Sequence, residues 1–153
     1  MKIRAAVTLC LSVLLMFTAG CSRPAVHEDF RKAADRENGK YCFTIAMTDT
    51  AGRYDLHLYS KIDCRPSVFE AMPDTIRMNM MFTAPSGQRY SEEFPVPKQS
   101  VSRETDFSRE YEIPYRLGLV PAEKGIWRLD ITIENENMFP GLRGLGLRTA
   151  WKE

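Results

Sequence analysis

From Lys40 onward, apolar and polar side chains alternate with a period of two residues. The pattern is clearest over residues 127–133, where the alternating apolar residues are Trp127, Leu129, Ile131 and Ile133. Because successive side chains of a β-strand point to opposite faces of a sheet, this period predicts strands with one buried face. No long segment has the period of about 3.6 residues that is typical of a helix, so the chain is predicted to be all-β.

About seven segments are predicted to be strands on this basis. They lie within residues 41–48, 54–58, 76–82, 90–96, 107–115, 127–134 and 145–151. Turn residues Asp49–Gly52 predict a hairpin between the first two, and Pro95 with Pro97 places the fourth near a sheet edge. The pattern predicts an antiparallel two-sheet β-sandwich, Ig-like or jelly-roll-like, with a closed barrel as the alternative.

The N-terminal segment has the pattern of a secretory signal peptide. Lys2 and Arg4 precede the weakly polar or apolar run Ala5–Phe17, and the small residues 18–20 lead into Cys21. The run is shorter than the ~20 residues that span a bilayer. A buried N-terminal helix would explain the basic start and the run but not small residues placed directly before a cysteine. We therefore predict cleavage before Cys21.

The segment Ala19-Gly20-Cys21 resembles the lipobox of bacterial lipoproteins, although Thr18 stands where leucine is usual. The resemblance implies that the Cys21 sulfur carries diacylglycerol, with acyl chains such as palmitate, so that the membrane is a partner. By analogy with lipoprotein sorting, Ser22 in place of aspartate suits the outer membrane of a bacterial envelope.

Three parts of the chain are therefore predicted. Residues 1–20 are the signal peptide, residues 21–39 the lipid anchor and tether, and residues 40–153 the β-sandwich domain. We expect the tether to hold at most one or two helical turns, because only Val26, Phe30 and a few alanines can form an apolar stripe.

Composition narrows the class of protein further. Of 153 residues, 44% are hydrophobic and 27% are charged, which is too apolar for a disordered tail and too polar for a polytopic membrane protein. The formal net charge of +1 supplies no field for non-specific binding of nucleic acid, so no nucleic-acid partner is expected.

Cys42 and Cys64 are the cysteines left to the domain for a disulfide in an oxidising compartment. In the expected hairpin, however, Cys42 lies nearer Ser60 than Cys64. A four-residue offset is ~13 Å along a strand, more than the ~5.5 Å between the Cα atoms of a bridged pair. A Cys42–Cys64 bridge and two free thiols both stay open.

Residues suited to catalysis are sparse. His27 and His57 are the only histidines, so a histidine-rich metal site cannot form, and no cofactor is expected. Glu92 and Glu93 are adjacent in a strand, so their carboxylates should point to opposite faces. The chain is therefore predicted not to be an enzyme.

Aromatic and loop residues are the remaining candidates for binding. Five aromatic residues could include a sugar-stacking platform: Tyr59, Tyr90, Tyr115, Trp127 and Trp151. The two tryptophans are in register with aliphatic core positions, which favours burial. In the connection 135–144, the apolar residues Met138, Phe139 and Leu142 could contact a partner, or else pack on the sandwich.

Several short segments that follow the lipobox resemble the segments of a known family in their order and spacing. They are Tyr54-Asp55-Leu56-His57-Leu58-Tyr59, Ala84-Pro85-Ser86-Gly87, Lys124-Gly125-Ile126-Trp127, Met138 through Leu142, and Gly144-Leu145-Gly146-Leu147-Arg148. Their order and spacing resemble the gliding-motility lipoprotein H (GldH) family from Cys21 to Trp151. Lys61 and Glu92-Glu93 depart from the residues usual in that family.

The resemblance implies an envelope lipoprotein without catalytic residues, which contacts other envelope proteins in a gliding-motility or secretion-related assembly. The family defines no binding residues that could be assigned here. A carbohydrate- or peptide-binding lipoprotein is the alternative, and no particular small-molecule ligand is indicated.

We predict that Cys21 is the lipidated N-terminus of the mature protein. Mass spectrometry of the membrane fraction should find Cys21 with acyl chains attached, and Cys21→Ser should release the protein from membranes, since each buried CH₂ contributes ~0.8 kcal/mol to anchoring. An unmodified N-terminus at another residue would contradict the prediction.

Overall fold

The computed structural model describes residues 26–152, so Cys21 and the predicted signal peptide lie outside it. The elements are β1 (Val26–Lys32), η1 (Ala33–Asp35), β2 (Tyr41–Met47), β3 (Arg53–Asp63), α2 (Pro66–Glu70), β4 (Thr75–Thr83), β5 (Arg89–Pro97), β6 (Arg103–Thr105), β7 (Ser108–Leu119), β8 (Gly125–Ile133), η2 (Glu136–Met138) and β9 (Leu142–Lys152).

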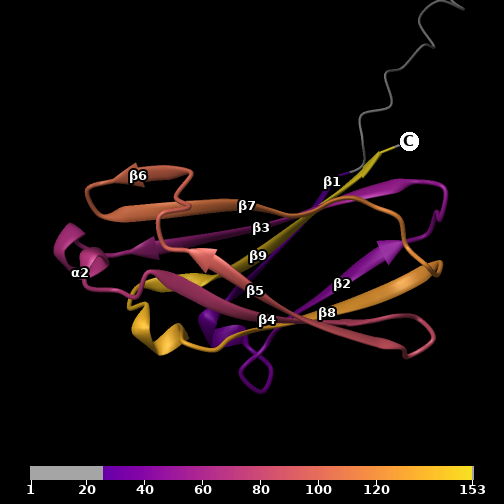
Figure 1. Ribbon diagram of the computed structural model, residues 1–153, viewed down its shortest axis with the longest axis horizontal. Helices are drawn as coiled ribbons and strands as arrows, with labels where there is room; N and C mark the ends of the chain where they lie inside the picture. The colour runs from indigo at the N-terminus through magenta and orange to yellow at the C-terminus, as the bar shows by residue number, and fades with distance from the viewer. Residues whose placement is uncertain (1–25, 153) are drawn as a thin grey trace, which may run out of the picture.

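The strands form two sheets that pack face to face. The five-stranded sheet has the order β1-β9-β3-β7-β6 and the four-stranded sheet the order β2-β8-β4-β5. Every neighbouring pair is antiparallel. In Figure 1, β3, β7 and β9 lie above β2, β4 and β8. The predicted antiparallel two-sheet β-sandwich is confirmed.

The core lies between the two sheets and consists of alternate residues of the strands. In β8 the inward residues Trp127, Leu129 and Ile131 are buried, whereas Arg128 is exposed. Burial of such side chains removes apolar surface from water and stabilises the fold. Trp127 therefore belongs to the core, as the alternation predicts.

Trp151 lies at the rim of the core and is only partly buried. Its indole covers Gly52, where an added Cβ would lie 2.0 Å from Nε1. Glycine at this position leaves the space that the indole occupies, because real Cβ atoms do not approach so closely.

The hairpin predicted between residues 41–48 and 54–58 is wrong. β2 pairs with β8 in the four-stranded sheet, while β3 pairs with β7 and β9 in the other sheet. The connection between β2 and β3 therefore crosses from one layer to the other. Alternation alone cannot distinguish the two arrangements, because β2 and β3 bury their apolar faces in the same core either way.

The N-terminal part of the domain also differs from expectation. Val26–Lys32, predicted as tether, forms strand β1 and pairs along its whole length with β9, from Val26 opposite Ala150 to Lys32 opposite Gly144. Pairing is possible despite the polar sequence because β1 is an edge strand, and its residues are exposed or only partly buried. β6, which has three residues, is another strand that the alternation of apolar and polar residues does not predict.

A buried lysine closes the end of the sandwich near α2. The Lys98 ammonium group donates to the carbonyl oxygens of Phe69, Glu70 and Met72 at 3.3, 3.1 and 2.8 Å, although the residue is only 3% exposed. These carbonyls lie at and just beyond the C-terminus of α2, where a cation is favourable.

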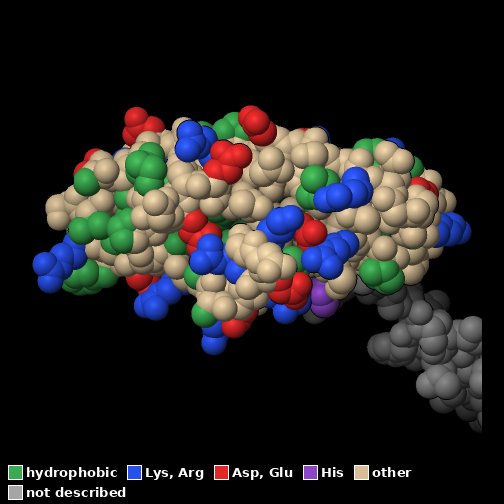
Figure 2. All heavy atoms as spheres, turned by 90° about the horizontal axis from the view of Figure 1, so that it is seen from below, with side chains coloured by type: hydrophobic (Ala, Val, Ile, Leu, Met, Phe, Trp, Pro, Cys, Tyr) green, Lys and Arg blue, Asp and Glu red, His purple; other side chains and the backbone are tan. Residues whose placement is uncertain are grey.

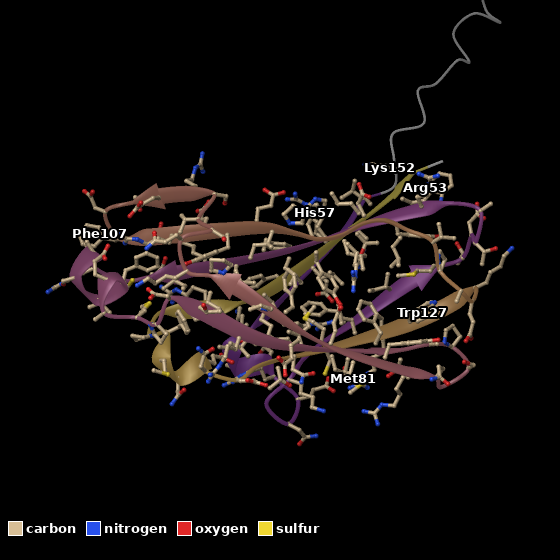
Figure 3. The ribbon with its side chains drawn as sticks, viewed as in Figure 1. Arg53, His57, Met81, Phe107, Trp127 and Lys152 are labelled. Carbon is tan, nitrogen blue, oxygen red and sulfur yellow. The ribbon has the colours of Figure 1, made fainter. Side chains whose placement is uncertain are left out.

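Charged side chains of both signs are interspersed on the face of the molecule seen in Figure 2. His57 points outward from β3 and is only partly exposed (Figure 3). Its Nδ1 is buried and has no hydrogen-bond partner among residues 26–152.

The buried carboxylate of Asp55 lies beside two irregularities in the β3–β7 ladder, where β7 has the extra residues. The register of β3 with β7 shifts on both sides of Leu56. Asp55 there accepts a hydrogen bond of 2.8 Å from the Gly118 amide and forms an ion pair with Lys152. The ion pair, together with the Gly118 hydrogen bond, lowers the pKa of Asp55.

We predict that Asp55→Asn destabilises the domain by about 1–3 kcal/mol at pH 7 and by progressively less as the pH falls below the unfolded-state pKa of ~3.9. The pKa is lower in the folded state, so the charged carboxylate stabilises the fold above its unfolded pKa, and this contribution is lost as pH falls through the folded pKa. Urea unfolding between pH 2.5 and 7 measures the difference.

The control is Asp106→Asn, because Asp106 is exposed and forms no ion pair among the described residues. It should leave the pH dependence of stability unchanged. An Asp55→Asn effect that stays constant over the whole pH range would contradict the assignment.

Candidate aromatic groove

A groove with a volume of about 410 Å³ opens between the two sheets at one end of the sandwich. We call it the aromatic groove. Its lining residues are Met47, Phe82, Tyr90, Ser91, Glu92, Arg116, Leu119, Val120, Pro121, Ala122 and Trp127. They come from the ends of β2, β4 and β7, the beginnings of β5 and β8, and the connection between β7 and β8.

Trp127 forms the fixed floor of the aromatic groove. It is 7% exposed, and its Nε1 donates a hydrogen bond of 3.0 Å to the Glu123 carbonyl oxygen. Tyr90 stacks on it, with ring centroids 6.2 Å apart and planes inclined by 28°, yet remains 48% exposed. The groove therefore presents the Tyr90 ring to solvent on a rigid aromatic support.

The connection between β7 and β8 is tied to the turn between β4 and β5. The Glu123 carboxylate accepts hydrogen bonds from the Ser86 amide at 3.1 Å and the Ser86 hydroxyl at 2.6 Å. Gly125 has φ +138°, and an added Cβ would lie 2.8 Å from Cγ of Pro85. Glycine thus allows both the backbone angle and the close packing that fix this side of the groove.

The polar wall of the groove is an ion pair held by a buried tyrosine. Glu92 pairs with Arg116 through one carboxylate oxygen and accepts a hydrogen bond from the Tyr115 hydroxyl through the other. Tyr115 is 8% exposed and packs edge to face on Phe94, with centroids 4.9 Å apart. Burial and the neighbouring Glu92 raise the pKa of Tyr115, so it stays a hydrogen-bond donor at neutral pH.

This arrangement suits non-covalent binding. The lining is mainly apolar, with a few fixed polar groups, as in binding sites generally. Glu92 already has two partners, so it is not a free acid or base. An apolar or aromatic group can stack on Tyr90 while its polar atoms contact the exposed side of Arg116, whose side chain is 50% exposed.

The structure separates the three apolar residues expected in the connection 135–144. Met138 is 50% exposed, Phe139 is 2% exposed and Leu142 is partly buried against the core. They therefore do not form one exposed patch. Asn135, at the start of this connection, is buried and bonds the backbone of Thr75 and Arg77 at 2.9 and 3.0 Å.

Cys42 and Cys64 are both free thiols. Cys42 is in β2 of the four-stranded sheet, and Cys64 directly follows β3 of the other sheet. Burial raises the pKa of both thiols, which keeps them protonated at neutral pH. The predicted lipidation site, Cys21, lies outside the described residues.

The five aromatic residues that could include a sugar-stacking platform do not lie together as one group. Tyr115 and Trp127 are buried, and Trp151 is partly buried. Tyr59 lies on the outer face of the five-stranded sheet and stacks on Phe30, with centroids 5.9 Å apart. Of the five, Tyr90 and Trp127 line the aromatic groove, and Tyr90 is the one whose ring is largely exposed there.

Glu92 and Arg116 were missed as a functional pair by reasoning from the sequence. One signal was present for Glu92, since it shares the two-residue period of Tyr90 and Phe94 and so belongs to the inward face of β5. Glu92 is indeed partly buried and Glu93 exposed, as opposite faces require. Nothing in the sequence indicates that Arg116 meets Glu92.

In residues 26–152, no group of three or more His, Cys, Asp or Glu side chains is arranged to hold a metal ion. Within the same range, no helix combines the length and the apolar character needed to cross a membrane. Comparison with known proteins finds no matching family model and no matching curated protein.

We predict that the two stacked rings differ sharply in their contribution to stability. Trp127→Ala should lower the free energy of unfolding by ~3–5 kcal/mol, because it leaves a large cavity in the core. Tyr90→Ala should lower it by less than about 1 kcal/mol, because that ring is half exposed. Denaturant unfolding measures both; near-native stability of Trp127→Ala would contradict the packing described.

Proposed function

We propose that this protein is a bacterial envelope lipoprotein that binds other envelope proteins without catalysis, as a component of a gliding-motility or secretion-related assembly. The resemblance to the gliding-motility lipoprotein H family supports this proposal. Ser22 favours the outer membrane as its location.

The observation that carries the proposal is where the residues of the resemblance meet. The segments Ala84–Gly87 and Lys124–Trp127 pack together where Pro85 meets Gly125, and Ser86 bonds Glu123, the residue before the second segment and 37 residues away. One segment supplies the turn that holds the connection between β7 and β8, and the other supplies the floor, Trp127. We therefore place the proposed partner-binding surface at the aromatic groove, which these two segments help to build.

The groove itself favours binding of a protein side chain. An exposed aromatic ring on a rigid support costs little conformational entropy when it becomes buried, and aromatic residues with arginine are enriched at interface centres. Tyr90 supplies the ring and Arg116 the guanidinium group, and Val120 adds exposed apolar surface beside them. We therefore propose that an apolar side chain of the partner enters the aromatic groove beside Arg116.

Anchoring through Cys21 would keep this surface close to the membrane. β1 begins at Val26, so only five residue steps separate Cys21 from the sheet. Such a segment spans at most roughly 17 Å. Membrane partners would therefore be met at high effective concentration, and a modest interface would suffice.

A carbohydrate is the second candidate ligand. The half-exposed ring of Tyr90 favours it, because flat aromatic rings bind the apolar faces of sugars. The adjacent Glu92–Arg116 pair could bond sugar hydroxyl groups. This candidate places binding in the same groove and differs only in the ligand.

Crosslinking and co-purification from intact envelopes test the proposal. The double variant Tyr90→Ala with Val120→Asp should reduce recovery of the specific partner roughly tenfold, because it removes the ring and charges the apolar wall. Phe107→Asp is the matched control, since Phe107 is 67% exposed and lies at the opposite end from Trp127 (Figure 3).

The wild type and the Phe107 variant should recover the same partner in equal amounts. Equal recovery by the groove variant would contradict the proposal, as would turnover of a substrate by the purified protein. Binding of protein-free envelope glycans that is lost with Tyr90→Ala, without a protein partner, would support the carbohydrate candidate instead.

A further inference from the structure

The free edge of β2 differs from the other three strands that end the two sheets. A sheet edge presents unpaired backbone groups, and natural proteins usually protect it with charges, proline, a bulge or a very short strand. β1 contains Glu28, Asp29, Arg31 and Lys32, β5 contains Pro95 and Pro97, and β6 has only three residues. Each of these edges therefore has a recognisable protection.

β2 has none of these protections. Its seven residues, Tyr41–Met47, include no charge and no proline, and its register with β8 runs without a shift. Thr44 and Ala46 on its outer face are small and exposed. Among the described residues, no backbone group of Tyr41–Met47 forms a backbone hydrogen bond outside the strand ladder. Within residues 26–152, one side of this neutral strand is thus left without backbone partners.

A groove lies directly beside this edge. It has a volume of about 730 Å³ and runs between the beginning of β1 and the end of β2. Figure 1 shows these two strands diverging from the short connection that joins them. We call this space the edge groove. Val26, Tyr54, Thr149 and Trp151 line it from the five-stranded sheet, and Thr44–Thr48 has four of its residues in the lining on the other side.

We propose that β2 binds an extended segment of a partner protein as an added strand of the four-stranded sheet. Only an extended backbone can pair with the backbone groups of an edge, and alternate side chains of that strand would then point into the edge groove. Apolar side chains fit there, next to Ile45, Tyr54 and Trp151. The segment therefore alternates apolar with small polar residues.

The edge groove favours a single segment over a second copy of this chain. Two β2 strands could pair, but the inward residues Phe43 and Ile45 of each copy are already buried in its own core, at 1% and 2% exposure. They could not also fill the edge groove of the other copy. A separate extended segment has its side chains free to do so.

Charge on the partner segment is also constrained. β2 is uncharged, and among residues 26–152 the titratable side chains that line the edge groove, apart from tyrosine, are His27 and Asp49. Desolvating a charged side chain in this space would be costly without a partner. We therefore expect the residues that enter the groove to be neutral.

The test uses the full chain in detergent with the synthetic peptide acetyl-Lys-Thr-Val-Thr-Val-Thr-Val-Lys-amide as the probe. Hydrogen exchange resolved by residue should show the amides of Tyr41–Met47 slowed by the peptide, because strand pairing protects them. A peptide of the same sequence with N-methylated valines and threonines cannot donate backbone hydrogen bonds and should give no protection.

The variant Thr44→Lys with Ala46→Lys places charges along the edge and should weaken binding of the probe at least about tenfold. Leu117→Lys is the control, because Leu117 is 62% exposed and lines neither groove. It should bind the probe as the wild type does. Both variants are first checked for native stability by denaturant unfolding.

Several results would overturn the inference. They are no added protection at β2, equal protection by the N-methylated peptide, protection confined to β5 or β1, or a dimer of the chain that forms through β2 and excludes the peptide. Because the aromatic groove is not involved, Tyr90→Ala should leave binding of the probe unchanged. The two proposals can thus fail independently.

Discussion

Burial of alternate apolar side chains between two sheets is the interaction on which the rest of the structure depends. β8 lies between β2 and β4, and β3 lies between β9 and β7, so the central strands supply fully buried residues such as Leu129 and Leu58. The interior between the layers is filled by these side chains. The proposed binding surfaces therefore lie at the rims and edges where the two layers separate.

Both grooves lie at such places, and both touch the end of β2. Met47 lines the aromatic groove, while Ala46 and Thr48 line the edge groove. Val26, the first described residue, lines the edge groove as well. A lipid on Cys21 would therefore hold both proposed surfaces at the end of the sandwich nearest the membrane. The opposite end is closed by α2 and by Lys98, which bonds the carbonyls there.

The strands could be predicted from the sequence because their inner faces obey one rule. Trp127 and Met80 are buried as the two-residue period requires, and Glu92 and Glu93 point to opposite faces. Which strands pair could not be predicted, because β2 and β3 present the same alternation whether they share a sheet or face each other across the core.

Features that depend on contacts between distant residues also could not be predicted from the sequence. β1 is polar, so its pairing with β9 leaves no apolar pattern, and the tether was predicted where a strand occurs. Lys98 has a residue type that is mostly exposed, yet it is buried by the carbonyls of a distant helix. The aromatic groove could be anticipated only through Tyr90 and Trp127, since Arg116 reaches Glu92 from another sheet.

The central claim is that an anchored sandwich binds its partners at one end and not at the other. Hydrogen exchange resolved by residue, compared between the native membrane and the detergent-purified chain, tests it most directly. The account predicts that the membrane state adds protection at Tyr41–Met47 and at residues 119–122, and none at Phe107. Added protection at the Phe107 end alone, or equal exchange in both states, would contradict it.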